Sequence, residues 1–265
     1  MIRNFSGYSI GIDAGSVATK GVLFNGKLVK EIVIPTGWSP KKASEEACKL
    51  LIKDANIKRE EVKKIIATGY GRVSIDFADK TITEITCHAK GAYFLNNKVR
   101  TILDIGGQDS KTISLDEKGN VCDFFMNDKC AAGTGRFLQV MTNLLGSEIS
   151  ELDKLAEGAE PEKISSMCTV FAESEIISLL ANGASKESIA AGIIESIANR
   201  AVSMLNKIRV VDEIAFTGGV AKSRILTKCI EKKIRKPIYI APNTQIIGAL
   251  GAAVIGWEML NIRGN

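Results

Sequence analysis

The feature that most constrains the fold is a short segment that occurs twice in the chain. Residues 13–20 read Asp-Ala-Gly-Ser-Val-Ala-Thr-Lys, and residues 104–111 read Asp-Ile-Gly-Gly-Gln-Asp-Ser-Lys. The aspartate, the first glycine, the hydroxyl residue and the lysine fall at the same places in both segments. Each segment lies between two short runs of β-forming residues, so the pattern predicts a strand, a glycine turn and a second strand, which together form a hairpin.

These hairpins have the composition of a phosphate clamp. Glycines let backbone N–H groups approach a phosphate closely, and the aspartate can face a magnesium ion bound to that phosphate. Neither the Gly-x-x-x-x-Gly-Lys-Ser/Thr loop nor the Gly-x-Gly-x-x-Gly fingerprint, each of which opens a helix, occurs in the sequence. Ordinary tight turns also place glycine beside polar residues, but a repeat that preserves residue identity favours the clamp.

Two later segments extend the pattern. Residues 213–220 form a short apolar run that ends in paired glycines, and residues 241–253 lead from a turn into a helix rich in glycine and alanine. Together with the hairpins, and in this order, they resemble the phosphate, connect and adenosine motifs of the actin, Hsp70 and sugar-kinase superfamily. The resemblance covers essentially the whole chain, and it implies that ATP or ADP binds in a cleft between two actin-like, ribonuclease H-like α/β lobes.

A helical pattern over residues 82–92 would be the first connecting motif of that superfamily. Within it, Glu84 occupies the position of the acid that orients the attacking water in Hsp70-like ATPases. A glutamate at the start of a helix is also a common capping partner, so both interpretations of Glu84 stay open at this point.

Two of the six cysteines, Cys130 and Cys168, each come just before a predicted helix. The positive end of a helix dipole and its free N–H groups lower the pKa of a thiol and suit the thiolate to metal binding. An unpaired cysteine is otherwise most often a small buried hydrophobe. We assign that structural role to three others: Cys48, Cys87 and Cys229. Cys122 is left without an assignment.

The residues around Cys130 and Cys168 are more specific than the spacing of the two cysteines, which matches neither a zinc ribbon nor a ferredoxin. Residues 130–137 read Cys-Ala-Ala-Gly-Thr-Gly-Arg-Phe, and residues 168–175 read Cys-Thr-Val-Phe-Ala-Glu-Ser-Glu. With the second hairpin upstream, they closely resemble the ATPase activators (component A) of 2-hydroxyacyl-CoA dehydratases and the related ATPase subunits of benzoyl-CoA reductase, the BadF/BadG/BcrA/BcrD type.

The resemblance implies a homodimer in which Cys130 and Cys168 of both subunits bind one 4Fe-4S cluster. ATP turnover would drive a low-potential electron from that cluster to a 2-hydroxyacyl-CoA dehydratase, the component D partner, in anaerobic amino-acid fermentation. A ferredoxin or a flavodoxin would supply the electron. One departure from the pattern is small: Val17 and Ala18 stand in the first hairpin where relatives often carry hydroxyl residues.

The same resemblance assigns the site residues and the lobes. Asp13 and Asp104 would hold Mg²⁺ through water, and Glu84 would orient the attacking water. Contacts with the phosphates and the adenosine are expected from Gly15, Ser16, Thr19, Lys20, Gly106, Gly107, Gln108, Gly218, Gly219 and Pro242. The first lobe is expected to span residues 1–98, with the C-terminal helix, 249–265, packed back on it, and the second lobe residues 99–248.

Composition excludes several other classes. The net charge of +5 is spread along the chain, whereas a nucleic-acid-binding protein concentrates basic residues in a patch. No N-terminal segment reads as a signal peptide, and the longest apolar stretch, residues 246–260, is interrupted by Glu258 and falls short of the ~20 residues of a membrane span. We therefore expect a cytoplasmic protein with no membrane or nucleic-acid partner. The single histidine, His88, excludes a site that needs two imidazoles.

Other functions of the same fold remain as alternatives. The partner could be a reductase, in which case the chain would be the ATPase subunit of a benzoyl-CoA reductase-type enzyme. A small-molecule kinase would need a sugar-binding insertion and a catalytic base, and the short chain leaves little room for the insertion. An actin-like polymer or an Hsp70-like binding module is disfavoured because no peptide-binding domain follows.

Overall fold

The computed structural model describes residues 7–165, 168–211 and 213–262, and these form two compact units. The first unit contains the described residues up to Val99, the segment Leu115–Cys122 and the residues from Ala241 onward. The second contains Arg100–Ser114 and Asp123–Ile240. Each unit is built on one five-stranded sheet that mixes parallel and antiparallel pairs, so the predicted α/β class is confirmed.

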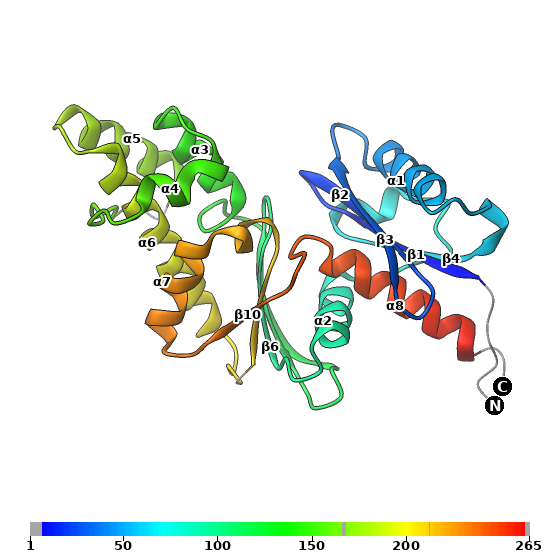
Figure 1. Cartoon of the computed structure of the whole chain (residues 1–265). Helices are drawn as coiled ribbons and strands as arrows, with labels where there is room; N and C mark the ends of the chain where they lie inside the picture. The colour runs from blue at the N-terminus through cyan, green and yellow to red at the C-terminus, as the bar shows by residue number, and fades with distance from the viewer. Residues whose placement is uncertain (1–6, 166–167, 212, 263–265) are drawn as a thin grey trace. The chain divides into compact units, whose positions relative to one another are not determined.

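The sheet of the first unit carries helices on both faces. Its strands follow the order β3 (Leu28–Pro35), β2 (Ala18–Phe24), β1 (Tyr8–Ala14), β4 (Val62–Thr68) and β5 (Lys80–Thr81). Its helices are α1 (Pro40–Asp54), α2 (Glu84–Leu95) and α8 (Ile247–Ile262), with short 3₁₀ turns η1 (Arg59–Glu61) and η2 (Tyr70–Ser74). Figure 1 shows α1 on one side of this sheet and α8 on the other.

Strand β1 distributes its side chains between these two layers, because successive residues of a strand point to opposite faces. Ile10 and Ile12 belong to the apolar cluster that includes Leu51 of α1. On the opposite face, Ser9 donates a hydrogen bond to the carbonyl of Ala253 in α8, 2.7 Å away. Asp13 lies four residues after Ser9 on the same strand, so its side chain points to the same face of the sheet, which α8 covers.

Helix α8 packs against α2 with almost no side chain between the two backbones. A methyl group added at Gly251 would lie 1.8 Å from the carbonyl oxygen of Cys87, and one added at Gly91 would lie 2.1 Å from the carbonyl oxygen of Ile247. The glycines of the two helices therefore allow a contact between their backbones.

The sheet of the second unit is covered by a layer of helices on one face (Figure 1). Its strands follow the order β10 (Ile238–Ile240), β9 (Ile214–Thr217), β6 (Thr101–Ile105), β7 (Ser110–Leu115) and β8 (Val121–Asn127). Its helices are α3 (Gly135–Leu144), α4 (Leu152–Ala156), α5 (Thr169–Ala181), α6 (Lys186–Leu205) and α7 (Arg224–Ile234), with 3₁₀ turns η3 (Ile149–Glu151) and η4 (Gly219–Lys222). Leu103 and Ile105 of β6 join the apolar core made by these helices, so Asp104 between them lies on the other face.

Both predicted hairpins are present. β1 pairs antiparallel with β2, and β6 pairs antiparallel with β7.

Within the described residues, no helix is both long enough and apolar enough to cross a membrane.

Candidate functional site

The first hairpin places a carboxylate opposite a lysine. Asp13 on β1 and Lys20 on β2 are directly paired across the two strands, and Lys20 Nζ lies 3.2 Å from Asp13 Oδ2. Asp13 is only 4% exposed, and the lysine compensates its buried charge.

The side chains of two buried threonines stabilise the turn of this hairpin. The Thr36 hydroxyl donates to the carbonyl of Gly15 at 2.7 Å and lies 2.9 Å from the hydroxyl of Thr19. Thr19 is completely buried, whereas Ser16 at the tip is exposed. The backbone of the tip is therefore open to a ligand, and Thr19 supports it from inside.

The second hairpin repeats this arrangement and adds two partners. Lys111 Nζ lies 3.0 Å from Asp104 Oδ2 and 2.6 Å from Asp109 Oδ2. The Thr217 hydroxyl donates to Asp104 Oδ1 at 2.7 Å. Asp104 and Lys111 are both 2% exposed, while Gln108 at the turn is exposed. Two buried carboxylates, each with a cation across the hairpin, are thus a property of the fold and not only of the sequence.

These carboxylates suit magnesium. Mg²⁺ prefers oxygen ligands, keeps several of its waters and commonly binds through one or two carboxylates together with substrate phosphates. Asp13 and Asp104 supply the carboxylates, and the exposed turns beside them leave room for phosphate. The donor chemistry of both hairpins therefore fits a hydrated magnesium ion.

Glu84 is the first residue of α2, after the N-cap Thr83, whose hydroxyl accepts from the N–H of Thr86. In a capping box the acid stands at the third helical position, which Thr86 occupies here. The capping-box interpretation of Glu84 is therefore wrong. His88 follows one turn later, buried, with Nδ1 2.9 Å from the carbonyl oxygen of Glu84.

Strand β9 is followed by the paired glycines that the family resemblance assigns to the adenosine motif. Gly218 has a φ of 91°, which favours glycine, and Gly219 begins η4. Pro242 is exposed and lies in the first unit, between β10 and α8.

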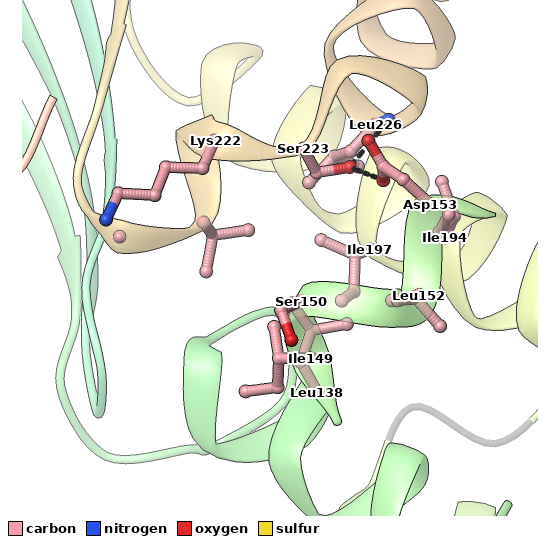
Figure 2. Close-up of a pocket in the computed structure, with 12 residues that line it drawn as sticks. Leu138, Ile149, Ser150, Leu152, Asp153, Ile194, Ile197, Lys222, Ser223 and Leu226 are labelled. Atoms are coloured by element: carbon pink, nitrogen blue, oxygen red, sulfur yellow. Dashed lines mark hydrogen bonds between the residues drawn. The ribbon is translucent and has the colours of Figure 1, made fainter. Parts of the chain in front are cut away.

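A cavity of about 410 Å³ lies beside these glycines in the second unit, within the usual volume of a small-molecule pocket. Gly219 and Val220 contribute to its wall. Most of the remaining lining is aliphatic: Leu138, Ile149, Leu152, Ile194, Ile197 and Leu226. Figure 2 shows Lys222 extending away from this aliphatic group, while the Ser223 hydroxyl donates to the carboxylate of Asp153.

The chain contains one further repeat, which was not predicted from the sequence. Strand β4 ends in Thr68 and is followed by Gly69, just as β9 ends in Thr217 and is followed by Gly218. The signal was a short apolar strand that ends in Thr-Gly, and it is visible in the sequence at residues 65–69 and 214–218.

The two cysteines singled out from the sequence are both exposed. Cys168 is the N-cap of α5, as the prediction of a helix start requires. For Cys130 the prediction is wrong, because α3 begins only at Gly135 and has Thr134 as its N-cap. A turn intervenes: Gly133 has a φ of 78°, and the Thr134 N–H donates to the carbonyl of Ala131 at 3.0 Å. Cys168 thus lies directly at a helix start, whereas a turn separates Cys130 from one.

Three of the remaining thiols are poorer ligands. Burial raises the pKa of Cys48 and of Cys87 to about 12, and it raises the pKa of Cys229 to about 11 with help from the Glu195 carboxylate. Cys122 is exposed in the first unit. Among the described residues, no three Cys, His, Asp or Glu side chains gather into a metal site. The donor set thus offers two exposed thiols in the second unit, which fits half of a four-thiolate cluster site.

Hydrogen bonds join the second hairpin to the segment that begins at Cys130. The N–H groups of Gly135 and Arg136, at the start of α3, donate to the carbonyls of Gly106 and Gly107 at 2.9 and 2.8 Å. The turn of the second hairpin is therefore in direct hydrogen-bond contact with the start of α3.

The fold and the paired aspartate-lysine hairpins define an actin-like ATP-binding protein. The BadF/BadG/BcrA/BcrD ATPase family matches residues 10–256, and the chain belongs to this family.

Several relatives are similar over nearly their whole length. The activator of lactoyl-CoA dehydratase from Anaerotignum propionicum is 46% identical over 257 residues, which are 95% of this chain and 98% of that protein. The crystal structure of Acidaminococcus fermentans (R)-2-hydroxyglutaryl-CoA dehydratase component A superposes with a TM-score of 0.92 at 40% identity, covering 96% of this chain and 99% of that one. The activator of 2-hydroxyisocaproyl-CoA dehydratase from Clostridium difficile, solved with bound ADPNP, gives a TM-score of 0.91 at 40% identity and covers 97% of each chain.

Proposed function

We propose that this chain is an ATP-hydrolysing activator that transfers a low-potential electron to a 2-hydroxyacyl-CoA dehydratase. The observation that carries the proposal is the full-length match to activators of such dehydratases, in a chain that keeps both buried aspartate-lysine hairpins. The structure of a relative solved with bound ADPNP supports the proposal that this chain binds an adenine nucleotide.

The nucleotide-binding roles follow from the hairpins. Asp13 and Asp104 hold the hydrated Mg²⁺, and the hairpin turns bind the phosphates through backbone N–H groups and polar side chains. The residues proposed for these phosphate contacts are Gly15, Ser16, Lys20, Gly106, Gly107 and Gln108, while the buried Thr19, which was expected among them, supports the turn from inside. Glu84 orients the attacking water from the first turn of α2.

The base and ribose are proposed to lie next to Gly218, Gly219 and Pro242. The aliphatic cavity beside Gly219 provides an apolar surface on which an adenine ring can pack. The positive φ of Gly218 favours glycine, so no side-chain atoms occupy the space where the strand ends.

Cys130 and Cys168 are proposed to be ligands of a 4Fe-4S cluster. Such a cluster needs four thiolates, and the second unit of one chain offers two exposed thiols, Cys130 and Cys168, so two identical chains would complete the site in a homodimer. When bound, the cluster supplies one-electron chemistry at low potential. A ferredoxin or a flavodoxin is the proposed source of the electron.

The coupling between nucleotide and cysteine is carried by the chain itself. Nucleotide phosphates at Gly106 and Gly107 would shift two carbonyls that accept hydrogen bonds from the start of α3. The Ser110 hydroxyl also donates to the carbonyl of Gly133 at 2.9 Å, within the turn that follows Cys130. Changes at the second hairpin would therefore alter the position of Cys130.

The test is reconstitution without oxygen. The purified chain is mixed with reduced ferredoxin, Mg²⁺, ATP and, in turn, lactoyl-CoA, 2-hydroxyisocaproyl-CoA and 2-hydroxyglutaryl-CoA dehydratases. We expect at least one dehydratase to gain activity only when both ATP and this chain are present, with ADPNP as the non-hydrolysable control. ATP hydrolysis without activation of any dehydratase would reject the activator role, and an iron-free, colourless protein would reject the cluster.

A further inference from the structure

Each site carboxylate lies beside a parallel strand that ends in threonine. In the first unit, Asp13 of β1 is the register neighbour of Thr68 of β4. In the second unit, Asp104 of β6 is the register neighbour of Thr217 of β9. The two threonines thus occupy equivalent places next to the two carboxylates.

The glycines that follow the threonines fix this equivalence. Gly69 has φ 87° and ψ 179°, and Gly218 has φ 91° and ψ 175°, so the chain leaves both strands in the same way. Each glycine also packs on the residue that follows the carboxylate. A methyl group at Gly69 would lie 2.8 Å from the carbonyl oxygen of Ala14, and one at Gly218 would lie 2.2 Å from that of Ile105. The backbone therefore presents each threonine to its aspartate in a similar geometry.

The hydrogen bond formed in one unit is absent from the other. Thr217 Oγ1 donates to Asp104 Oδ1 at 2.7 Å. Thr68 Oγ1 is fully buried and has no hydrogen-bond partner among the described residues. Asp13 Oδ1 is instead turned toward Gly69, where an added methyl group would lie 2.3 Å from it.

A buried hydroxyl without a partner is unfavourable, and it needs an explanation in a native structure. The thiol of Cys87 is within reach of the Thr68 hydroxyl, but a thiol is a weak hydrogen-bonding group, and this one stays neutral because burial raises its pKa to about 12. A rotation of the Asp13 side chain would bring its carboxylate from Gly69 to Thr68, on the adjacent strand.

We propose that Thr68 and Thr217 are paired positioning residues for the two carboxylates. Thr217 holds Asp104 whether or not nucleotide is bound. Thr68 donates to Asp13 only when magnesium nucleotide is bound and the carboxylate turns toward its hydroxyl. This inference rests on the proposed function, because the bound state that it describes is that of an ATPase.

The two valine variants test the proposal, because valine keeps the shape of threonine and removes the hydroxyl. Thr68→Val and Thr217→Val are compared with Thr68→Ser and Thr217→Ser, which restore a hydroxyl. Thr142→Val in α3 is the control for threonine-to-valine replacement at a buried site outside the hairpins. The first measurement is thermal unfolding in EDTA without nucleotide. The second is binding of a fluorescent ADP analogue as Mg²⁺ is increased.

The two variants should differ. Thr217→Val should unfold at a lower temperature than wild type even without nucleotide, because it loses a hydrogen bond to a buried charge. Thr68→Val should match or exceed the nucleotide-free unfolding temperature of wild type, yet need about tenfold more Mg²⁺ for half-maximal binding. Thr68→Ser should restore the Mg²⁺ requirement.

An unchanged Mg²⁺ requirement in Thr68→Val would overturn the proposal. So would a nucleotide-free destabilisation of Thr68→Val as large as that of Thr217→Val, because Thr68 would then be engaged at all times. If the wild-type chain bound no nucleotide in the presence of Mg²⁺, the proposed function would itself fail, and the wild-type titration alone reveals that case.

Discussion

The contact between α2 and α8 predicts that a single added methyl group lowers the stability of the fold substantially. In Gly251→Ala, the new methyl would lie 1.8 Å from the Cys87 carbonyl oxygen and 2.8 Å from the Gly91 nitrogen, whereas ordinary contacts begin at 3.4 Å. Both obstacles are backbone atoms, so no side chain can move aside. The helices must separate by roughly 1.5 Å, and the cost belongs at the upper end of the 1–3 kcal/mol that overpacking commonly takes.

Helix propensity acts in the opposite direction, because alanine is favoured over glycine by about 1 kcal/mol inside a helix. The net loss of stability for Gly251→Ala is therefore about 2 kcal/mol, which corresponds to a fall of roughly 4–8 °C in unfolding temperature. Gly256→Ala is the matched control on the same helix. Its methyl would meet the side-chain atom Ile66 Cγ1 at 3.0 Å, which can shift, so we expect little loss or a small gain.

Circular dichroism during heating and urea unfolding would measure both variants under identical conditions. Since α2 begins at Glu84 and α8 covers the face of β1 that carries Asp13, Gly251→Ala should also lower ATP turnover. Unfolding of Gly251→Ala and Gly256→Ala at the same temperature would contradict this prediction. That result would mean that the two helices are not in backbone contact in solution.

Three further predictions concern the proposed site. Glu84→Gln should keep ATP binding and lose hydrolysis by about 100-fold or more, because it removes the group that positions water; parallel measurements of affinity and turnover decide this, and a collapse of affinity would contradict it. Asp13→Asn or Asp104→Asn should weaken Mg²⁺-dependent turnover while the iron content per chain stays that of wild type; loss of iron would show that the two sites are not separate. Cys130→Ala or Cys168→Ala should each abolish a cluster shared by two chains and leave ATP binding intact, as native mass spectrometry with iron analysis can establish; four irons on a single chain would rule out sharing.

The hairpins could be predicted from the sequence because their signal is strictly local. Strand, glycine turn and strand are encoded within a few residues, and the repeat supplied an independent check. Hairpin pairing then sets Asp13 opposite Lys20 and Asp104 opposite Lys111, so the charge pairs follow from the local pattern.

The threonines beside the carboxylates could not be found in that way. Thr68 reaches Asp13 through a parallel pairing of β1 with β4, and parallel neighbours are separated by long crossover connections whose register the sequence does not reveal. The start of α3 was placed too early for a different reason. The segment after Cys130 contains Gly133 in a left-handed conformation, and it forms a turn before the helix begins at Gly135.

The lysine of each hairpin has a consequence for the order in which ligands arrive. Lys20 and Lys111 already neutralise Asp13 and Asp104. A bare Mg²⁺ ion therefore gains little electrostatic stabilisation when it approaches either carboxylate. A magnesium-nucleotide complex brings its own phosphate oxygens, to which the lysine ammonium groups can transfer while the carboxylates turn to the metal. If the hairpins bind Mg²⁺ as proposed, we therefore expect them to favour the magnesium-nucleotide complex over the free ion.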